Sequence, residues 1–270
     1  IKSLQTSLLL LTGMAGYFSA VKQPESWLDA LTGAASLFLT ISGSTIINMW
    51  YDRDIDACMQ RTCWRPLPSG KIRPDESLIL GMVLILAGTS WAFHLTWQFG
   101  AVVSAGIFFD ILIYTVWLKR RTAWAIVWGG IAGGMPVLAG RTLALGRIDP
   151  VGLLLSLAVL LWIPTHIMTF SVRHKQDYDS AGIPTFPSAY GIRSTLVIIT
   201  CASLLAASSM MLAALQASLL PIHMHLLVIA SAGLFLLAAI MLIKPTNHIY
   251  KILYKYASFY MMVAMILFAI

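Results

Sequence analysis

The chain has 270 residues, of which 59% are hydrophobic and 11% are charged, and its formal net charge is +7. An average soluble domain has about 25% charged residues, so this composition excludes a soluble globular enzyme, and it also excludes a disordered chain. The mean hydropathy of +0.81 predicts an all-α polytopic membrane protein. Three scattered cysteines are too few for a disulfide framework.

Apolar stretches of about 20 residues, the length of a helical span, follow one another along the sequence. The uncharged stretch 77–109 is too long for one helix and is divided at His94–Gly100, and the stretch after Arg193 is divided near Pro221. The first stretch has no basic segment and no cleavage site before it, so we expect a span and not a signal peptide. We predict one domain, residues 1–270, with nine spans: 3–21, 28–50, 76–94, 97–117, 122–142, 151–171, 195–216, 222–243 and 251–270.

The distribution of basic residues predicts the topology. If the N-terminus is cytoplasmic, 15 of the 18 Lys and Arg residues fall on cytoplasmic segments, and only Lys22, Arg141 and Arg147 fall outside. This bias predicts a multi-pass protein of the cell membrane with its C-terminus outside. Since the basic residues lie in short loops between spans, the positive charge does not require a nucleic-acid partner.

Two cytoplasmic loops, about residues 51–75 and 172–194, are longer and more polar than is needed to connect two spans. Seven of the eleven acidic residues lie in these loops or at their helix ends. The external loops are short and carry few reactive side chains. We therefore expect the active site at the cytoplasmic face.

The first loop begins with a regular series of oxygen donors. Asn48, Asp52 and Asp56 are four residues apart, and a helix that continued through Asp56 would place them within an arc of roughly 80°. Three such oxygens on one stripe suit a hard cation, and Mg²⁺ is commonly shared with a phosphate. The alternative is a solvated acidic helix end with Arg53 as its counter-ion. Asp54 would face the opposite side.

The second loop contains Asp177 and Asp179, either of which could complete a metal site opposite the first loop; the alternative is an ordinary polar loop. Carboxylates together with basic side chains are what a diphosphate requires, with metal ions between acids and phosphate oxygens. The candidate diphosphate-binding residues are Arg53, Arg61, Arg65, Lys119 and Lys175. Most basic residues could instead serve only to fix the topology.

Three further polar residues lie within predicted spans. Asp110 is costly at membrane depth and is therefore a functional candidate, with Tyr114 one turn on as a possible partner. His166 could contact a substrate or a haem iron. The structural alternatives are a hydrogen-bonded Asp and an interhelical hydrogen bond from His166.

The segment Asn48-Met-Trp-Tyr-Asp-Arg-Asp-Ile-Asp56, followed by Arg65-Pro-Leu-Pro-Ser-Gly70, resembles the first aspartate-rich motif of the UbiA-type intramembrane prenyltransferases. It is most similar to the protoheme IX farnesyltransferase (haem O synthase) branch. The similarity continues through residues 114–122, 129–136, 162–166 and 177–184. Two departures are Gln176, where the branch usually has a second acid, and Thr165, where it usually has proline.

The resemblance implies nine helices around a central cavity and a Mg²⁺-dependent site formed by Asn48, Asp52, Asp56 and Asp177. It also implies transfer of a prenyl group, farnesyl in this branch, from farnesyl diphosphate to a vinyl group of haem B within the membrane lipid. The prenyl group or the acceptor would then contact Asp110, Tyr114 and His166.

Two alternatives stay open from the sequence. One is a prenyltransferase with another acceptor, such as a quinone precursor, a chlorin or a lipid. The other is an ion-coupled transporter in which Asp110 and His166 relay protons. Acidic residues gathered at one mouth favour chemistry on a phosphorylated substrate, because transporters usually place charges near the midplane.

Overall fold

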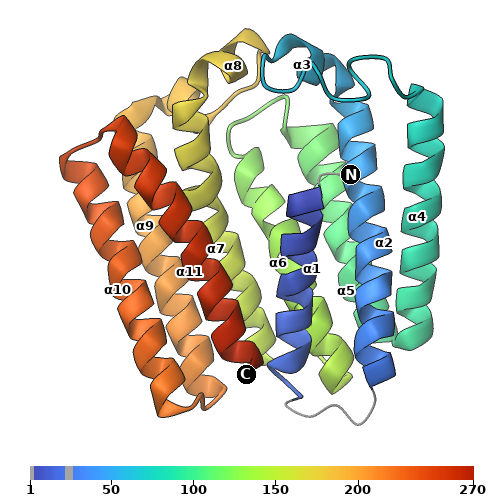
Figure 1. Cartoon of the computed structure of the whole chain (residues 1–270), viewed down its shortest axis with the longest axis vertical. Coiled ribbons are helices and arrows are strands. Elements are labelled where there is room, and N and C mark those ends of the chain that lie inside the picture. Colours follow the sequence, from blue (N-terminus) through green and yellow to red (C-terminus); the bar gives the residue numbers. More distant parts are fainter. Residues whose placement is uncertain (1–2, 22–26) are drawn as a thin grey trace.

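The computed structural model describes residues 3–21 and 27–270, and every regular element in these ranges is helical (Figure 1). The elements in chain order are α1 (Ser3–Phe18), α2 (Trp27–Tyr51), α3 (Arg53–Cys58), α4 (Pro74–Leu95), α5 (Trp97–Ile107), the π-helix η1 (Phe108–Leu118), α6 (Ala125–Leu145), α7 (Pro150–Arg173), α8 (Lys175–Ser180), α9 (Phe186–Gln216), α10 (Pro221–Ile243) and α11 (Asn247–Ala269). The predicted all-α membrane architecture is therefore confirmed.

Seven helical segments among the described residues are long and apolar enough to cross a membrane: α2, α4, α5 with η1, α7, α9, α10 and α11. Helices α1 and α6 coincide with two further predicted spans but are not among the seven. The count of nine spans and the placement of the termini therefore stay predictions. One element starts earlier than predicted: α9 is Phe186–Gln216, but it is broken at Gly191, where φ is 79° and ψ is 165°. The helix after this break agrees with the predicted span 195–216, and the short segment 186–190 before it was not predicted.

Local sequence explains where several helices begin and end. Proline opens α4, α7 and α10, where its missing N–H costs nothing. Asp149 caps α7 by accepting a hydrogen bond from the Gly152 N–H at 3.0 Å. Helix α6 ends at Gly146, whose φ of 67° is the left-handed conformation that glycine adopts easily.

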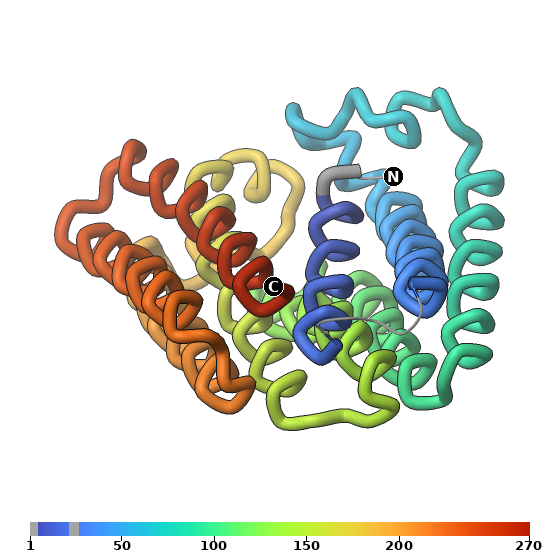
Figure 2. The backbone as a smooth tube through the Cα atoms, turned by 60° about the horizontal axis from the view of Figure 1, so that its bottom comes forward, coloured from blue at the N-terminus to red at the C-terminus, as the bar shows by residue number. Residues whose placement is uncertain are grey.

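Helix α6 contacts α1, α2, α5 and η1, and it also contacts α7, which packs against α9 and α11. It therefore links the first helices of the chain to the last ones (Figure 2). Its approach to α1 depends on small residues. A Cβ at Gly140 would lie 1.8 Å from the Gly13 carbonyl oxygen, and a Cβ at Gly16 would lie 2.1 Å from that of Val137. Such close backbone packing through small residues is typical of membrane helices.

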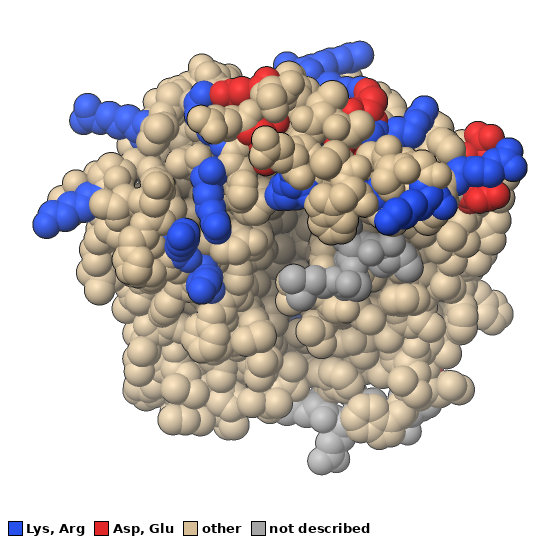
Figure 3. All heavy atoms as spheres, turned by 45° about the horizontal axis from the view of Figure 1, so that its top comes forward, with Lys and Arg blue, Asp and Glu red and all other residues tan. Residues whose placement is uncertain are grey.

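The two short helices α3 and α8 lie at the same end of the bundle (Figure 1). Ile55 and Met59 of the first loop pack with Ile183 of the second in a small apolar cluster, which Tyr178 covers. Figure 3 shows acidic and basic side chains gathered at this end, while the flank below it is largely uncharged. The two acidic loops therefore meet, as expected from the sequence.

Candidate active site

The stripe of oxygen donors forms, although the helix that carries it does not continue through Asp56 as predicted. Helix α2 ends at Tyr51, and Asp52 has φ −90° and ψ 6° before α3 begins at Arg53. The backbone N–H groups of Asp52 and Asp56 still donate to the carbonyl oxygens four residues earlier, at 3.0 and 2.8 Å. The break is thus too slight to disperse the donors, and Asn48, Asp52 and Asp56 are all buried.

Asp52 and Lys119 form the most buried ion pair of this end. Lys119 Nζ donates to Asp52 Oδ2, and only 3% of Asp52 is exposed. Lys119 also lies 5.7 Å from the centre of the Tyr114 ring. Burial by itself lowers the pKa of Lys119, but Tyr114 and Asp52 outweigh it and raise that pKa above its ordinary value. Lys119 is therefore a permanent cation at the site.

Asp56 is held by a second cation. Arg65 Nη1 donates to Asp56 Oδ2 at 2.8 Å, and the backbone carbonyl of Asp56 accepts from Thr62 Oγ1 at 2.9 Å. The segment after α3 folds back on the carboxylate in this way. Each of the two buried carboxylates, Asp52 and Asp56, is therefore paired with one cation.

The π-helix η1 explains why Lys119 reaches the site. An α-helix has 3.6 residues per turn, so nine residues make two and a half turns and would put Lys119 opposite Asp110. The wider turn of η1, with its i→i+5 hydrogen bonds, brings residues four, five and nine apart onto one face. The Lys119 N–H accordingly bonds to the Tyr114 carbonyl at 2.8 Å.

A chain of polar groups connects this face to α2. Asn48 Nδ2 donates to Thr115 Oγ1 at 2.8 Å, and Thr115 Oγ1 donates to the Asp110 carbonyl at 2.7 Å. Ser44 Oγ donates to the Asp110 carboxylate. Asp110 is therefore hydrogen-bonded between two helices, and Tyr114 lies within electrostatic reach of it.

Arg61 spans from the first loop to α7. Its guanidinium lies 5.2 Å from the centre of the Phe170 ring, and its buried Nε has no hydrogen-bond partner in the described part of the chain. The charges of Arg61, Lys119 and Asp177 all act on Tyr178, whose pKa is raised by burial. Tyr178 therefore marks the point where the two loops face each other.

The donor set fits a magnesium ion that arrives with a phosphorylated ligand. Across residues 3–21 and 27–270, no three His, Cys, Asp or Glu side chains lie close enough to form a ready-made metal cage. The predicted ligands Asn48, Asp52, Asp56 and Asp177 are thus not one compact cluster. However, Asp52 Oδ1 is buried and accepts no hydrogen bond from any described residue. Mg²⁺ commonly takes one or two carboxylates and completes its shell with water and phosphate oxygens.

Two predicted diphosphate-binding residues are engaged elsewhere. Arg53 donates to the Trp50 carbonyl at 2.8 Å and lies over the Trp50 ring. Lys175 pairs with Asp179 at 2.6 Å, four residues along the exposed helix α8. Each of these two side chains therefore contacts a local partner in this structure.

Asp54 faces away from the buried stripe, as the sequence predicted. It forms a bidentate pair with Arg120, both bonds being 2.7 Å. The Arg120 hydrogen bonds lower the pKa of Asp54. Arg120 thereby fixes the break between α2 and α3 from its solvent side.

His166 lies in a stack of aromatic side chains between α7 and α11. Its ring is 4.8 Å from that of Trp162 and 4.4 Å from that of Tyr254, and its Nδ1 is 3.1 Å from Ser258 Oγ. Phe170, which contacts Arg61, is 6.1 Å from the same Tyr254 ring. The stack therefore leads from His166 toward the cationic end of the site.

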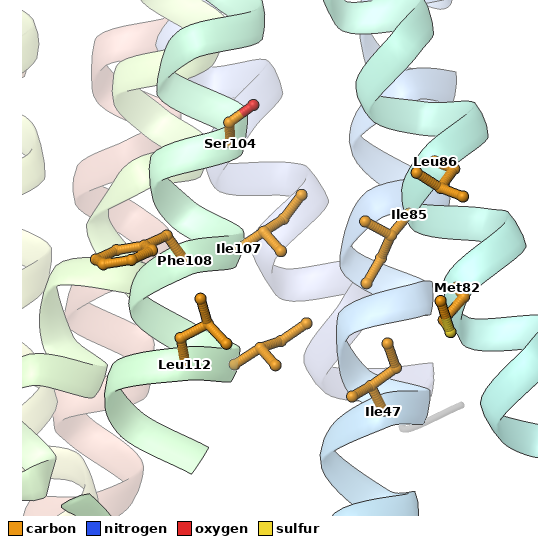
Figure 4. Close-up of a pocket in the computed structure, with 9 residues that line it drawn as sticks. Ile47, Met82, Ile85, Leu86, Ser104, Ile107, Phe108 and Leu112 are labelled. Carbon is orange, nitrogen blue, oxygen red and sulfur yellow. The ribbon is translucent and has the colours of Figure 1, made fainter. Parts of the chain in front are cut away.

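A groove of about 350 Å³ is visible between α4 and η1, with Ile47 of α2 in its wall (Figure 4). Its lining also includes Ile107 and Ser104 of α5, and Ser104 is the sole polar residue in it. Met82, Leu86 and Phe108 of the lining are exposed, so the groove opens to the outside of the bundle. It is suited to an apolar chain, and it is not the predicted central cavity.

Three residues of this arrangement were missed in the sequence: Ser44, Thr115 and Tyr178. Ser44 lies four residues before Asn48, so an extended search for i, i+4 polar residues on α2 could have found it. Thr115 carries no such signal, because its position on the shared face depends on the π-helical turn.

Comparison with known proteins identifies the family. The family model described as the UbiA prenyltransferase family matches residues 9–264. A protoheme IX farnesyltransferase of Archaeoglobus fulgidus is 39% identical over 260 residues, which cover 95% of this chain and 90% of that protein. One of Korarchaeum cryptofilum is 39% identical over 225 residues, covering 83% and 76%.

Solved structures share the fold at lower identity. A structure reported under digeranylgeranylglyceryl phosphate synthase has a TM-score of 0.82 at 20% identity and covers 100% of this chain and 98% of its own. A UbiA homolog from Archaeoglobus fulgidus bound to DMAPP and Mg²⁺ has a TM-score of 0.71 at 16% identity, covering 98% and 96%. With the family match over most of its length, this chain belongs to the UbiA prenyltransferase family and is an integral membrane prenyltransferase.

Proposed function

We propose that this enzyme transfers a farnesyl group from farnesyl diphosphate to a vinyl group of haem B. Diphosphate leaves, and a water molecule adds to the resulting cation and loses a proton, giving the hydroxyethylfarnesyl group of haem O. The choice of acceptor is supported by the similar archaeal proteins named protoheme IX farnesyltransferase. The choice of a diphosphate donor is supported by the site itself, where buried carboxylates and cations alternate at one end of the bundle.

The observation that carries the proposal is the buried carboxylate of Asp52. One oxygen bonds to Lys119 and the other has no partner among the described residues. An unpaired buried carboxylate oxygen is costly, so a cation that completes it is expected. Mg²⁺ arriving with the diphosphate would bind the unpartnered oxygen of Asp52, and Asn48, Asp56 and Asp177 are its further proposed ligands. A fold neighbour bound to DMAPP and Mg²⁺ supports the choice of ion. When bound, the ion supplies neutralisation of the diphosphate charge.

The chain's own cations would stabilise the charge that develops on the leaving group. Lys119 is fixed by Asp52, Arg65 is fixed by Asp56, and Arg61 is oriented by the Phe170 ring. Preorganised donors of this kind need no rearrangement when the C–O bond breaks. We assign diphosphate binding to these three residues and not to Arg53 or Lys175, because local partners occupy the latter two.

The allylic cation left on the prenyl group would meet π-faces and little water. The Tyr114 ring lies beside Lys119, and it could stabilise that cation once the diphosphate has left. We propose that the acceptor lies against the stack that contains His166, Trp162 and Tyr254. Asp110 would hold η1 against α2 by its hydrogen bond with Ser44, and so position the face of η1 that carries Tyr114.

We place this site at the cytoplasmic face of the cell membrane. The support is the excess of Lys and Arg on the loops at the end that carries α3 and α8. The exposed apolar side chains on the flanks of the bundle would contact membrane lipid.

The test uses the purified enzyme in detergent with Mg²⁺, farnesyl diphosphate and a panel of acceptors, with products identified by mass spectrometry. The panel contains haem B, a quinone precursor, a chlorin and a glycerol-phosphate lipid. A farnesylated and hydrated haem is expected, and product from another acceptor alone would overturn the haem assignment.

Asp52→Asn tests the donor side, and Asp54→Asn is its matched control. Both remove one carboxylate charge from the same segment, but Asp54 is bound to Arg120 on the exposed side. We expect Asp52→Asn to lose at least about 100-fold in turnover. The control should stay within a fewfold of the wild type, and full turnover in Asp52→Asn would refute the site.

A further inference from the structure

A polar cavity lies at the α3–α8 end of the bundle, apart from the carboxylate site. It has a volume of about 250 Å³ and is lined by Arg173 at the end of α7 and by Asn247, Tyr250 and Lys251 at the start of α11. No acidic residue belongs to this lining. The cavity thus combines two cationic side chains with two neutral hydrogen-bonding ones.

The two cations of this cavity have no counter-ion among the described residues. Arg65, Lys119, Arg120, Arg141 and Lys175 all pair with carboxylates. Within residues 3–21 and 27–270, neither Arg173 nor Lys251 forms an ion pair or a hydrogen bond, although both line the same cavity. Like charges held together without an anion repel each other, so the arrangement favours an anionic ligand.

Tyr250 and the helix end point to the same conclusion. Tyr250 is 6% exposed and lines the cavity, yet its hydroxyl has no hydrogen-bond partner among the described residues. The cavity also meets the N-terminus of the 23-residue helix α11. Thr246 Oγ1 accepts the Ile249 N–H at 3.3 Å and the Thr246 carbonyl accepts the Tyr250 N–H at 3.0 Å, while the N–H groups of Asn247 and His248 have no intrahelical acceptor. A helix N-terminus of this length favours an anion.

We propose that this cavity binds the phosphate headgroup of an anionic membrane phospholipid. Its volume lies just below the roughly 300–1,000 Å³ typical of whole small-molecule sites, and so suits a headgroup better than a complete substrate. Basic pockets between helices at a membrane surface are suited to anionic lipids. Ile252, beside Lys251 on α11, is exposed and would contact the acyl chains. The bound lipid would clamp α11 to the end of α7 that leads into α8.

The experiment compares lipid binding by the full-length protein after delipidation in a neutral detergent. Phosphatidylglycerol, phosphatidylcholine or inorganic phosphate is then added. Native mass spectrometry counts the lipid molecules bound to each protein, and thermal unfolding is measured in the same samples. The variants are Arg173→Gln with Lys251→Gln, and Tyr250→Phe. Lys255→Gln is the control, because Lys255 is an exposed cation one turn along α11 that does not line the cavity.

Wild type and Lys255→Gln are expected to retain phosphatidylglycerol in preference to phosphatidylcholine and to unfold at a higher temperature when it is added. The double variant should bind phosphatidylglycerol at least tenfold more weakly, and Tyr250→Phe severalfold more weakly. Equal binding by the double variant and the wild type would overturn the proposal. So would protection by inorganic phosphate alone, which indicates a free anion. A raised KM for the acceptor with unchanged lipid binding would reassign the site to a carboxylate of the acceptor.

Discussion

Replacing Lys119 by methionine tests the central ion pair of the site. The substitution keeps the length of the side chain and removes its charge. Asp52, which is 3% exposed, would then have no hydrogen-bonding side chain at either oxygen. Removing one partner of a buried pair costs about 3–5 kcal/mol, because the remaining charge is left unpaired. Since 20% of the Lys119 side chain is exposed, we expect a loss at the lower end of that range.

Lys119→Met should lower turnover strongly even where the protein remains folded. A preorganised donor to a developing anion contributes about 100- to 1,000-fold to kcat. The assay is farnesyl transfer at saturating donor and acceptor, with thermal unfolding of the same preparation. Lys175→Met is the control, because its exposed pair with Asp179 should be worth less than about 1 kcal/mol.

The double variant Asp52→Asn, Lys119→Met separates the two effects. It removes both charges, so it should recover most of the lost stability while turnover stays at the low level. If Lys119→Met instead keeps kcat within about twofold of the wild type in a folded protein, Lys119 does not stabilise the leaving group. The assignment of the diphosphate site would then be wrong.

Three further outcomes are expected. Chelation should abolish transfer, and added Mg²⁺ should restore it; transfer that persists after exhaustive chelation would exclude the metal assignment. Burial raises the pKa of Asp149, but the hydrogen bonds from Arg141 and the Gly152 N–H outweigh it, so the pKa is lowered in the folded protein. The carboxylate therefore stabilises the fold above its unfolded pKa, and this stabilisation is lost as the pH falls through the lower folded pKa. Acid unfolding should therefore be less steep in Asp149→Asn than in the wild type. Gly140→Ala should lower stability by about 1–3 kcal/mol, because the new Cβ would meet the Gly13 carbonyl at 1.8 Å, and an unchanged melting temperature would show that the helices separate freely.

The sequence predicted the elements well because charge and hydropathy mark where helices leave the membrane. Lys119 and Arg173 lie at the ends of their helices as expected. The short helical segment 186–190 was missed because Arg193 was taken as a span boundary. This segment precedes the break at Gly191, and Arg193 lies in the helix that follows the break.

The site was predicted only in part, because local spacing shows neighbours on one helix and not partners on another. The stripe of Asn48, Asp52 and Asp56 follows from i, i+4 spacing. The pairing of Asp52 with Lys119 joins residues 67 positions apart, and it needs the π-helical turn that no pattern in residues 108–118 revealed.

The composition of α6 follows from its neighbours. Five elements contact it, namely α1, α2, α5, η1 and α7. It can therefore contain four glycines in its first half, a proline, and a buried Arg141 that pairs with Asp149 at 2.8 Å. Against acyl chains, that arginine would carry a heavy penalty. Helix α10, with a hydropathy of 2.8 and most of its surface uncovered, is the opposite case. Replacing the small residues of α6 by larger apolar ones would therefore disrupt its packing against the neighbouring helices. Exchanging one aliphatic side chain for another on the outer face of α10 would leave the fold intact.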